Sequence, residues 1–197
     1  EDVRALPGVA SAGLTDMIPF GSGTSDSVIF AEGYQPKPGE SVISAYQTSV
    51  TPGYFESMGV RLLRGRFFSE ADTADSPRAI IIDDRIAERF WPGSNPIGRR
   101  MWRPSDPSLT PPADQSQYWT VVGVVNTVYV QSPTGSADRV GAVYYPMTQD
   151  TSRNIVLAVR SAIAPAALTP AIRQAVRRLD AELPIYNTRT MAERRDQ

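Results

Sequence analysis

Short apolar runs rich in β-branched residues constrain the fold of this chain more than any other feature of its sequence. The run AIIID at residues 79–83 is typical of a buried strand. The run VISAYQTSV at 42–50 alternates in polarity, which also predicts a strand. The longest run, TVVGVVNTVYV at 120–130, is strand-like and shorter than the roughly 18 residues that a membrane helix needs. We therefore expect a β-sheet.

Further strands are expected where similar short runs end at Pro, Gly or polar clusters. They are 9–19 (breaking at Pro19), 97–103, 154–161, a final strand at 183–191, and 118–130 with 140–147 as a strand pair. The segment 104–117 is rich in Pro, Ser and Asp and has no periodicity, so we expect it to be a mobile loop linking two strands.

Three segments have helical signals. In TPGYFESMG, Thr51 is the expected cap and Gly59 the expected end. In DDRIAERFW, either Asp83 or Asp84 is expected to cap the helix. The clearest helix covers 164–179, with charged and small residues on one side and an apolar stripe on the other. The stripe consists of Leu168, Ile172, Val176 and Leu179.

The two ends of the chain resemble each other. Residues 1–9, EDVRALPGV, read as the end of a helix that stops at Pro7 and Gly8, so we expect a piece of a longer protein. The windows at 3–16 and 176–190 each combine the end of an amphipathic helix, a proline and a strand. They indicate either two half-repeats of one α/β subdomain, with the middle of the chain inserted between them, or chance similarity.

The composition excludes several kinds of chemistry. The 197 residues contain no cysteine and no histidine, which rules out disulfides, cysteine nucleophiles, thiolate zinc sites and histidine-based triads. The formal net charge of −1 indicates neither a nucleic acid nor an anionic membrane as partner.

The stretch FWPGSNPIGRRM at 90–101 resembles a phosphate-binding loop only in its glycines and arginines. Its glycine spacing differs from that of a Walker loop, it follows a helix, and the one lysine, Lys37, lies between two prolines elsewhere. We interpret it as a helix end and a tight turn with solvated Arg99 and Arg100. No cofactor-binding residue is predicted.

Three carboxylates, Asp83, Asp84 and Glu88, form the best candidate cluster for acid–base chemistry or for Mg²⁺ or Ca²⁺. Acids in the first turn of a helix more often cap it and complement its dipole, so no catalytic or metal residue is assigned. Five aromatic residues could line a carbohydrate or drug pocket, although packing in a core is the commoner use. They are Trp91, Trp102, Trp119, Tyr144 and Tyr145.

Several stretches in order resemble a known family. They are VRALPGVASAG, VTPGYFESMGVRLLRGRFFSEAD, AIIIDDRIAERFWPGSNPIGRRM, WTVVGVVNTV, VYYPM and AIRQAVRRLDAELPIYNTRTM. Together they resemble the MacB-like periplasmic core domain of FtsX-type ABC transporter permeases, most of all the version in acidobacterial permeases with repeated periplasmic domains.

The resemblance implies an α+β fold of two parts. Residues 1–46 and 147–197 would form a porter-like βαβ subdomain whose first strand lies upstream, and residues 47–146 would form a smaller inserted α/β subdomain. The inserted part would include Tyr54, Phe55, Gly65, Arg66, Trp91, Pro92, Ile97 and Gly98.

The resemblance also implies a function without chemistry in this domain. The chain would lie at the periplasmic face of the inner membrane and relay conformational change between flanking membrane helices and envelope partners. Those partners would be a periplasmic adaptor protein, a cytoplasmic ATPase subunit or domain, and a second copy of the parent. The alternatives are a periplasmic module that binds a lipid, peptide or glycan, and a hydrolase that uses Asp83, Asp84 and Glu88.

Overall fold

The computed structural model describes residues 2–20, 25–36, 39–104, 111–128 and 141–196. Lys37 lies outside the described residues. None of the helices in these ranges is both long and apolar enough to cross a membrane.

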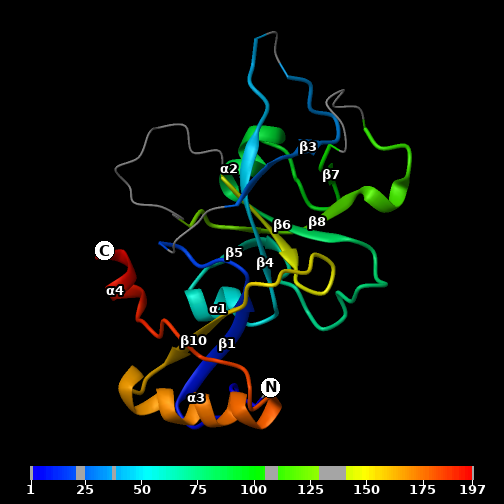
Figure 1. Cartoon of the computed structure of the whole chain (residues 1–197). Coiled ribbons are helices and arrows are strands. Elements are labelled where there is room, and N and C mark those ends of the chain that lie inside the picture. The colour runs from blue at the N-terminus through cyan, green and yellow to red at the C-terminus, as the bar shows by residue number, and fades with distance from the viewer. Residues whose placement is uncertain (1, 21–24, 37–38, 105–110, 129–140, 197) are drawn as a thin grey trace.

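Ten strands and four α-helices make up the described fold (Figure 1). The strands are β1 Val9–Thr15, β2 Asp26–Val28, β3 Phe30–Ala31, β4 Ser44–Val50, β5 Leu62–Gly65, β6 Ala79–Asp83, β7 Arg100–Trp102, β8 Trp119–Val125, β9 Ala142–Pro146 and β10 Val156–Ser161. The helices are α1 Tyr54–Met58, α2 Asp84–Phe90, α3 Pro165–Leu179 and α4 Met191–Arg195, with a 3₁₀ turn at Gln115–Gln117.

All ten strands belong to one mixed sheet. Its main order is β10-β1-β4-β9-β6-β8-β7-β3, while β2 pairs with β4 and β5 pairs with β8. The pairs β4–β9 and β6–β8 are parallel and the others are antiparallel. The α+β class is thus confirmed. The predicted pairing of the two strands around 118–130 and 140–147 is wrong, because β6 lies between β8 and β9.

The central strand β6 divides the interior into two cores. Its Ile80 and Ile82 side chains pack with Ile86 and Phe90 of α2. Its Ile81 points to the opposite face and joins a second core with residues of α1 and β9. Both faces of β6 are therefore buried, as the unbroken apolar run predicts.

Helix α1 ends as predicted but begins differently. Gly59 follows it in the left-handed region with φ of 70° and its N–H donates to Phe55 and Glu56 carbonyls. The predicted cap at Thr51 is wrong, because Gly53 holds the cap position without a side-chain bond. Thr51 instead accepts a hydrogen bond from the backbone N–H of Leu14 in β1 at 2.8 Å.

Helix α3 has the predicted bounds but only part of the predicted buried stripe. Leu168 and Ala175 are buried, whereas Leu179 is 71% exposed, so its place in the stripe is wrong. Leu179 is the last residue of the helix, and Asp180 after it is already extended.

The two predicted features at the chain ends differ from the structure. Residues 2–8 form turns and bends rather than a helix end. The expected strand at 183–191 is absent from the described fold, since 183–190 pairs with none of the ten strands and α4 begins at Met191. A strand needs a neighbour for its backbone groups, and local sequence preference alone does not supply one.

Candidate functional site

The strongest acidic candidates lie where β6 passes into α2. Asp83 is the N-cap of α2 and its Oδ1 accepts the backbone N–H of Ile86 at 2.9 Å. The Thr127 hydroxyl, beyond the end of β8, donates to Asp83 Oδ2 at 3.2 Å. Asp84 Oδ1 accepts the Thr127 backbone N–H at 2.9 Å and also binds its hydroxyl. The two carboxylates therefore converge on one threonine.

Gly141 reaches the same carboxylate from the other side. A Cβ at this position would lie 2.5 Å from Asp83 Oδ1, and the φ of 99° favours glycine. The backbone N–H of Ala142 also hydrogen-bonds to Asp83. Asp83 thus anchors the residues that precede and follow the connection between β8 and β9.

The chemistry of Asp83 follows from its complete burial. Desolvation raises the pKa of its carboxyl to about 6, against the lowering effect of the donors from Ile86, Ala142 and Thr127. The neighbouring Asp84 charge raises this pKa further. A carboxyl with its oxygens engaged by backbone and hydroxyl donors serves as an anchor, and no substrate can reach it without displacing those donors.

Glu88 does not join this pair. It lies one turn further along α2 and is exposed. Among the described residues, no group of three acids could hold a metal ion. The structure thus gives Asp83 the capping role that the sequence favours, places Asp84 beside it on Thr127 and leaves Glu88 in solvent.

The glycine- and arginine-rich stretch after α2 forms a corner. Trp91 ends the helix and its indole N–H donates to the Glu32 carbonyl at 3.1 Å. The N–H of Arg99 donates to the Pro96 carbonyl at 3.0 Å, which closes a turn. Arg99 is exposed as predicted.

Arg100 differs from the prediction of a solvated side chain. It pairs with Glu32 at 2.7 Å and its guanidinium lies 4.8 Å from the ring centroid of Tyr118. The side-chain hydrogen bond from Arg100 lowers the pKa of Glu32. The pair fastens β7 to the turn that follows β3.

The five candidate aromatic residues are all buried, none more than 7% exposed. Trp119 and Tyr145 meet edge to face at 4.6 Å, and Phe30 stacks on Trp102 at 5.8 Å. Their rings therefore pack in the interior, which is the use that the sequence favours.

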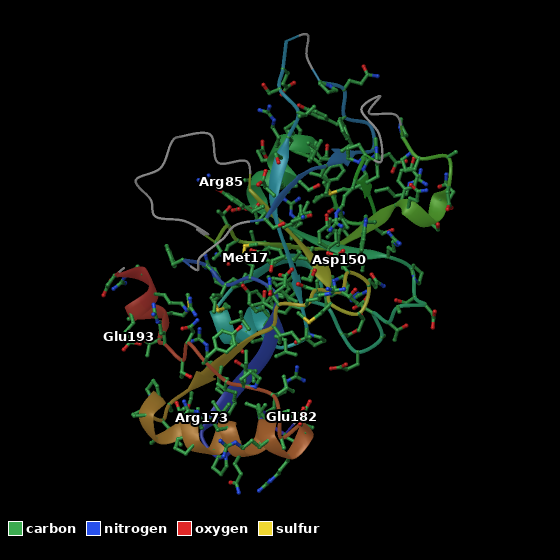
Figure 2. All side chains as sticks on the ribbon, in the orientation of Figure 1. Met17, Arg85, Asp150, Arg173, Glu182 and Glu193 are labelled. Atoms are coloured by element: carbon green, nitrogen blue, oxygen red, sulfur yellow. The ribbon has the colours of Figure 1, made fainter. Side chains whose placement is uncertain are left out.

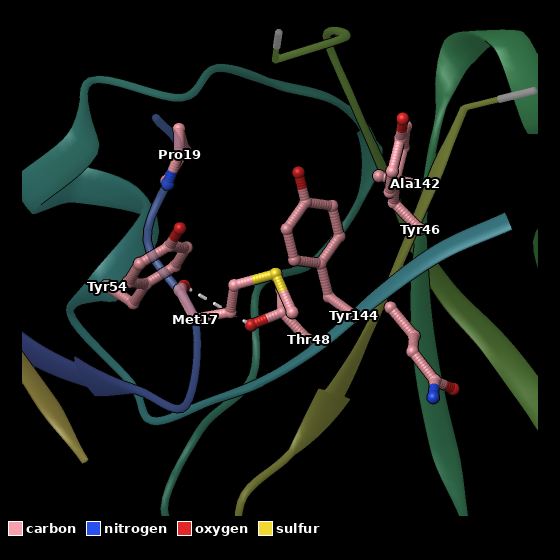
Figure 3. Close-up of a pocket in the computed structure, with 8 residues that line it drawn as sticks. Met17, Pro19, Tyr46, Thr48, Tyr54, Ala142 and Tyr144 are labelled. Carbon is pink, nitrogen blue, oxygen red and sulfur yellow. Dashed lines mark hydrogen bonds between the residues drawn. The ribbon is translucent and has the colours of Figure 1, made fainter. Parts of the chain in front are cut away.

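One small pocket opens between β4, β9 and α1 (Figure 3). It leaves about 20 Å³ for water-sized molecules, which is enough for one or two waters. A lipid, peptide or glycan would need several hundred cubic ångströms. The lining residues are Met17, Pro19, Tyr46, Gln47, Thr48, Tyr54, Ala142 and Tyr144. Desolvation raises the pKa values of the Tyr54 and Tyr144 hydroxyls, so both stay neutral.

A polar cluster that sequence reasoning missed connects β1, β4 and the turn after β9. It contains Asp16, Ser49, Asp150 and Arg103. Each residue alone resembles an ordinary turn or strand residue, and only the strand order brings them together. The one sequence signal for this cluster is Asp16, an aspartate directly after the strand β1.

Comparisons with known proteins place this fold. The model of the MacB-like periplasmic core domain matches residues 1–175. The periplasmic region of MacB from Actinobacillus actinomycetemcomitans is similar in structure, with a TM-score of 0.57 and 14% identity over 90% of this chain and 70% of that chain. The extracellular domain of the noncanonic ABC-type transporter YknZ from Gram-positive bacteria is similar too, with a TM-score of 0.55 and 17% identity over 91% of this chain and 79% of that chain.

Both structural similarities are too low in identity to show more than the fold. No curated protein matches the chain. The family model covers most of the sequence, including Asp83, which caps α2, and the corner that follows α2. The chain belongs to the family of MacB-like periplasmic core domains, which are extracytoplasmic parts of ABC transporter permeases.

Proposed function

We propose that this chain is a non-catalytic domain that relays conformational change within an ABC permease and contacts envelope partners. The observation that carries the proposal is the condition of Asp83 and Asp84, the best catalytic candidates. Asp83 caps α2, and both carboxylates hold Thr127. Such carboxylates stabilise a rigid body and are not free to transfer protons to a substrate.

The continuous sheet suits a relay. Hydrogen-bonded strands run from β10 at one end to β3 at the other, and a close-packed interior transmits strain instead of absorbing it. Displacement of one end would therefore move the other end as well. The motion would come from membrane helices coupled to a cytoplasmic ATPase, and a periplasmic adaptor would receive it.

The division into two subdomains is part of this proposal. Residues 1–46 and 147–197 would form the porter-like part, and residues 47–146 the inserted part. The pairing of β1 with β10, which come from opposite ends of the chain, supports a subdomain built from both ends. Helix α1 lies in the inserted part by sequence, yet it packs against β1 and β10.

The full-length permease tests the proposal. We expect it to co-purify from the bacterial envelope with an ATPase and an adaptor. Replacing residues 9–161 by a short linker should leave ATP hydrolysis intact and abolish adaptor capture and export. Co-purification with neither partner would contradict the proposal, as would turnover of any substrate by the 197-residue chain.

The pocket that the described residues form between β4, β9 and α1 holds only about 20 Å³, so this pocket does not support the alternative of a ligand-binding module. Ligand-dependent shifts in melting temperature would revive it. The hydrolase alternative predicts activity that D83N, D84N and E88Q each remove.

A further inference from the structure

The sheet is weakly joined at one place. We define the β1–β10 unit as β1, β10, α1 and α3, and the main sheet as the remaining strands with α2. Between β1 and β4 the only ladder pair is Thr15 with Val50. By comparison, β1 and β10 pair at six positions from Val9 to Thr15. In Figure 1, β1 and β10 lie at the lower end of the molecule, below the main sheet.

Beyond the Thr15–Val50 pair, side-chain hydrogen bonds join the end of β1 to β4. Asp16 Oδ1 accepts the Thr48 hydroxyl at 2.6 Å and the backbone N–H of Ser49 at 2.9 Å. The backbone N–H of Asp16 donates to the Ser49 carbonyl at 3.1 Å. The Thr15 and Thr48 hydroxyls lie 2.9 Å apart. The first residue beyond β1 is thus bound to β4 at three points.

Ser49 also connects β4 to the turn that follows β9. Its hydroxyl donates to Asp150 Oδ2 at 2.9 Å, in the turn that follows β9. Arg103, directly after β7, holds both Asp150 oxygens at 3.1 and 3.2 Å. The guanidinium also lies 4.0 Å from the ring centroid of Tyr145 and donates to its hydroxyl at 3.2 Å.

These contacts form one chain of polar groups, Asp16–Ser49–Asp150–Arg103, across segments that are distant in sequence. Ser49 within this chain and Thr15 next to Asp16 are almost fully buried. Asp150 lies near the middle of the molecule, whereas Arg173 and Glu182 lie at the end formed by α3 (Figure 2). Buried polar contacts have fixed geometry, because breaking one leaves a desolvated group without a partner.

We propose that this polar chain is the rigid joint through which the β1–β10 unit and the main sheet move as one body, with Asp16 as the residue that crosses between them. The inference rests on the proposed relay function and names the residues that carry the motion. Ser49 binds Asp16 with its backbone and Asp150 with its side chain, so it connects Asp16 to the interior of the main sheet. Within this polar chain only the Asp16 contacts join the two units, because Ser49, Asp150 and Arg103 lie in or next to strands of the main sheet.

Native-state hydrogen exchange of the 197-residue chain tests the joint. In D16A, which removes the side-chain acceptor for Thr48 and Ser49, we expect the amides of Leu14 and residue 16 and those of residues 156–160 to exchange about tenfold faster. The amides of residues 80–82 in β6 should keep their rates within about twofold. Faster exchange in β10 is decisive, because the Asp16 side chain bonds to β4 and not to β10, so only loosening of the whole unit reaches β10.

Two further variants sharpen this test. D26A is the matched control, since Asp26 lies in β2 and accepts the Ser44 hydroxyl of β4 within the main sheet. It should leave the rates in β1 and β10 unchanged. D16N keeps the shape of the side chain but weakens the bonds that its oxygen accepts from Thr48 and Ser49, and it should reproduce the D16A pattern should D16A fail to fold.

The joint and the relay can fail separately. Exchange that accelerates only at residues 16 and 49, or nowhere, overturns the joint whatever the permease does. In the full-length permease, D16A should keep ATP hydrolysis and lose at least half of the transport per ATP, a roughly twofold loss. Unchanged transport together with the expected exchange pattern overturns the relay function and leaves the joint in place.

Discussion

The centre of the main sheet is more deeply buried than the β1–β10 unit. All five residues of β6 are buried, between α2 on one face and the core around α1 on the other. In the β1–β10 unit, β10 has one buried residue, and Ile155 just before it is 60% exposed. The tail beyond α3 is more open still, with Tyr186 at 76%.

This difference shows where the stability of the molecule is concentrated. Apolar area removed from water is the main source of folding free energy, so the main sheet should hold most of it. The β1–β10 unit depends more on its attachments, which are the pairing with β4, the packing of α1 and the polar joint. In a domain that transmits motion, a stable main sheet can carry a less stable β1–β10 unit.

The largest effect is expected in β6. Replacing Ile81 by alanine removes a fully buried side chain between α1 and β9, and should lower the free energy of unfolding by about 4 kcal/mol. The exposed Leu179 is the matched control, and L179A should cost less than about 0.5 kcal/mol. Urea denaturation measures both. Similar losses for the two variants would remove the distinction between the regions.

The next effect depends on pH. Asp83 has a pKa of about 6 in the folded chain, above its ordinary value of 3.8. A raised folded pKa means that protonation stabilises the fold, so this contribution is complete below about pH 3.8 and lost as the pH rises through about 6. The loss should reach about 3 kcal/mol at most.

The Asp83 effect can be isolated by difference. Other carboxyls also titrate between pH 3.5 and 7.5, roughly the range in which acids in proteins ionise. The difference in unfolding free energy between the wild type and D83N should therefore be followed over this range. D84N removes the neighbouring charge that raises the pKa of Asp83, so it should move the Asp83 contribution to lower pH without abolishing it. A wild-type stability that rises relative to D83N across this range would show that the three donors outweigh burial.

A smaller effect is expected where α1 rests on β1. A Cβ on Gly13 would lie 2.3 Å from the Tyr54 backbone nitrogen, so G13A must push α1 away from the strand. The expected loss is about 2 kcal/mol, with faster exchange confined to the β1–β10 unit. Gly33 is a control, because nothing lies within 4 Å of a Cβ there and its φ of 80° brings only a local backbone cost. Equal exchange changes in β6 would argue against a separate unit.

Local features of the fold could be predicted from the sequence because neighbouring residues determine them. The strand at Ala79–Asp83, the cap at Asp83 and the helix end at Gly59 each depend on a few adjacent side chains. The strand order could not be predicted in the same way. The insertion of β6 between β8 and β9 depends on which buried faces match, and β-branched runs of similar length look alike.

The same distinction between local and long-range features applies to the functional residues. A cap at Asp83 or Asp84 follows from their place at the start of a helix, and the structure gives this role to Asp83, whereas Asp84 binds Thr127. The joint did not appear in the sequence, because Ser49 and Asp150 lie 101 residues apart and meet only once β4 and β9 pair. The sequence predicts a helix cap at Thr51, whereas its hydroxyl accepts a hydrogen bond from β1, because a capping pattern takes account only of the helix that follows.

The smallest effect is expected in the tail after α3. Tyr186 is almost free of contacts with the described fold, so Y186S should change the free energy of unfolding by less than about 0.5 kcal/mol. Ile185, its half-buried neighbour, is the control, and I185S should cost about 1 kcal/mol. The same urea titrations measure both. A loss in Y186S as large as that in I185S would mean that the tail packs more firmly in solution. The less stable part of the molecule would then end at α3 and would not include the tail that follows it.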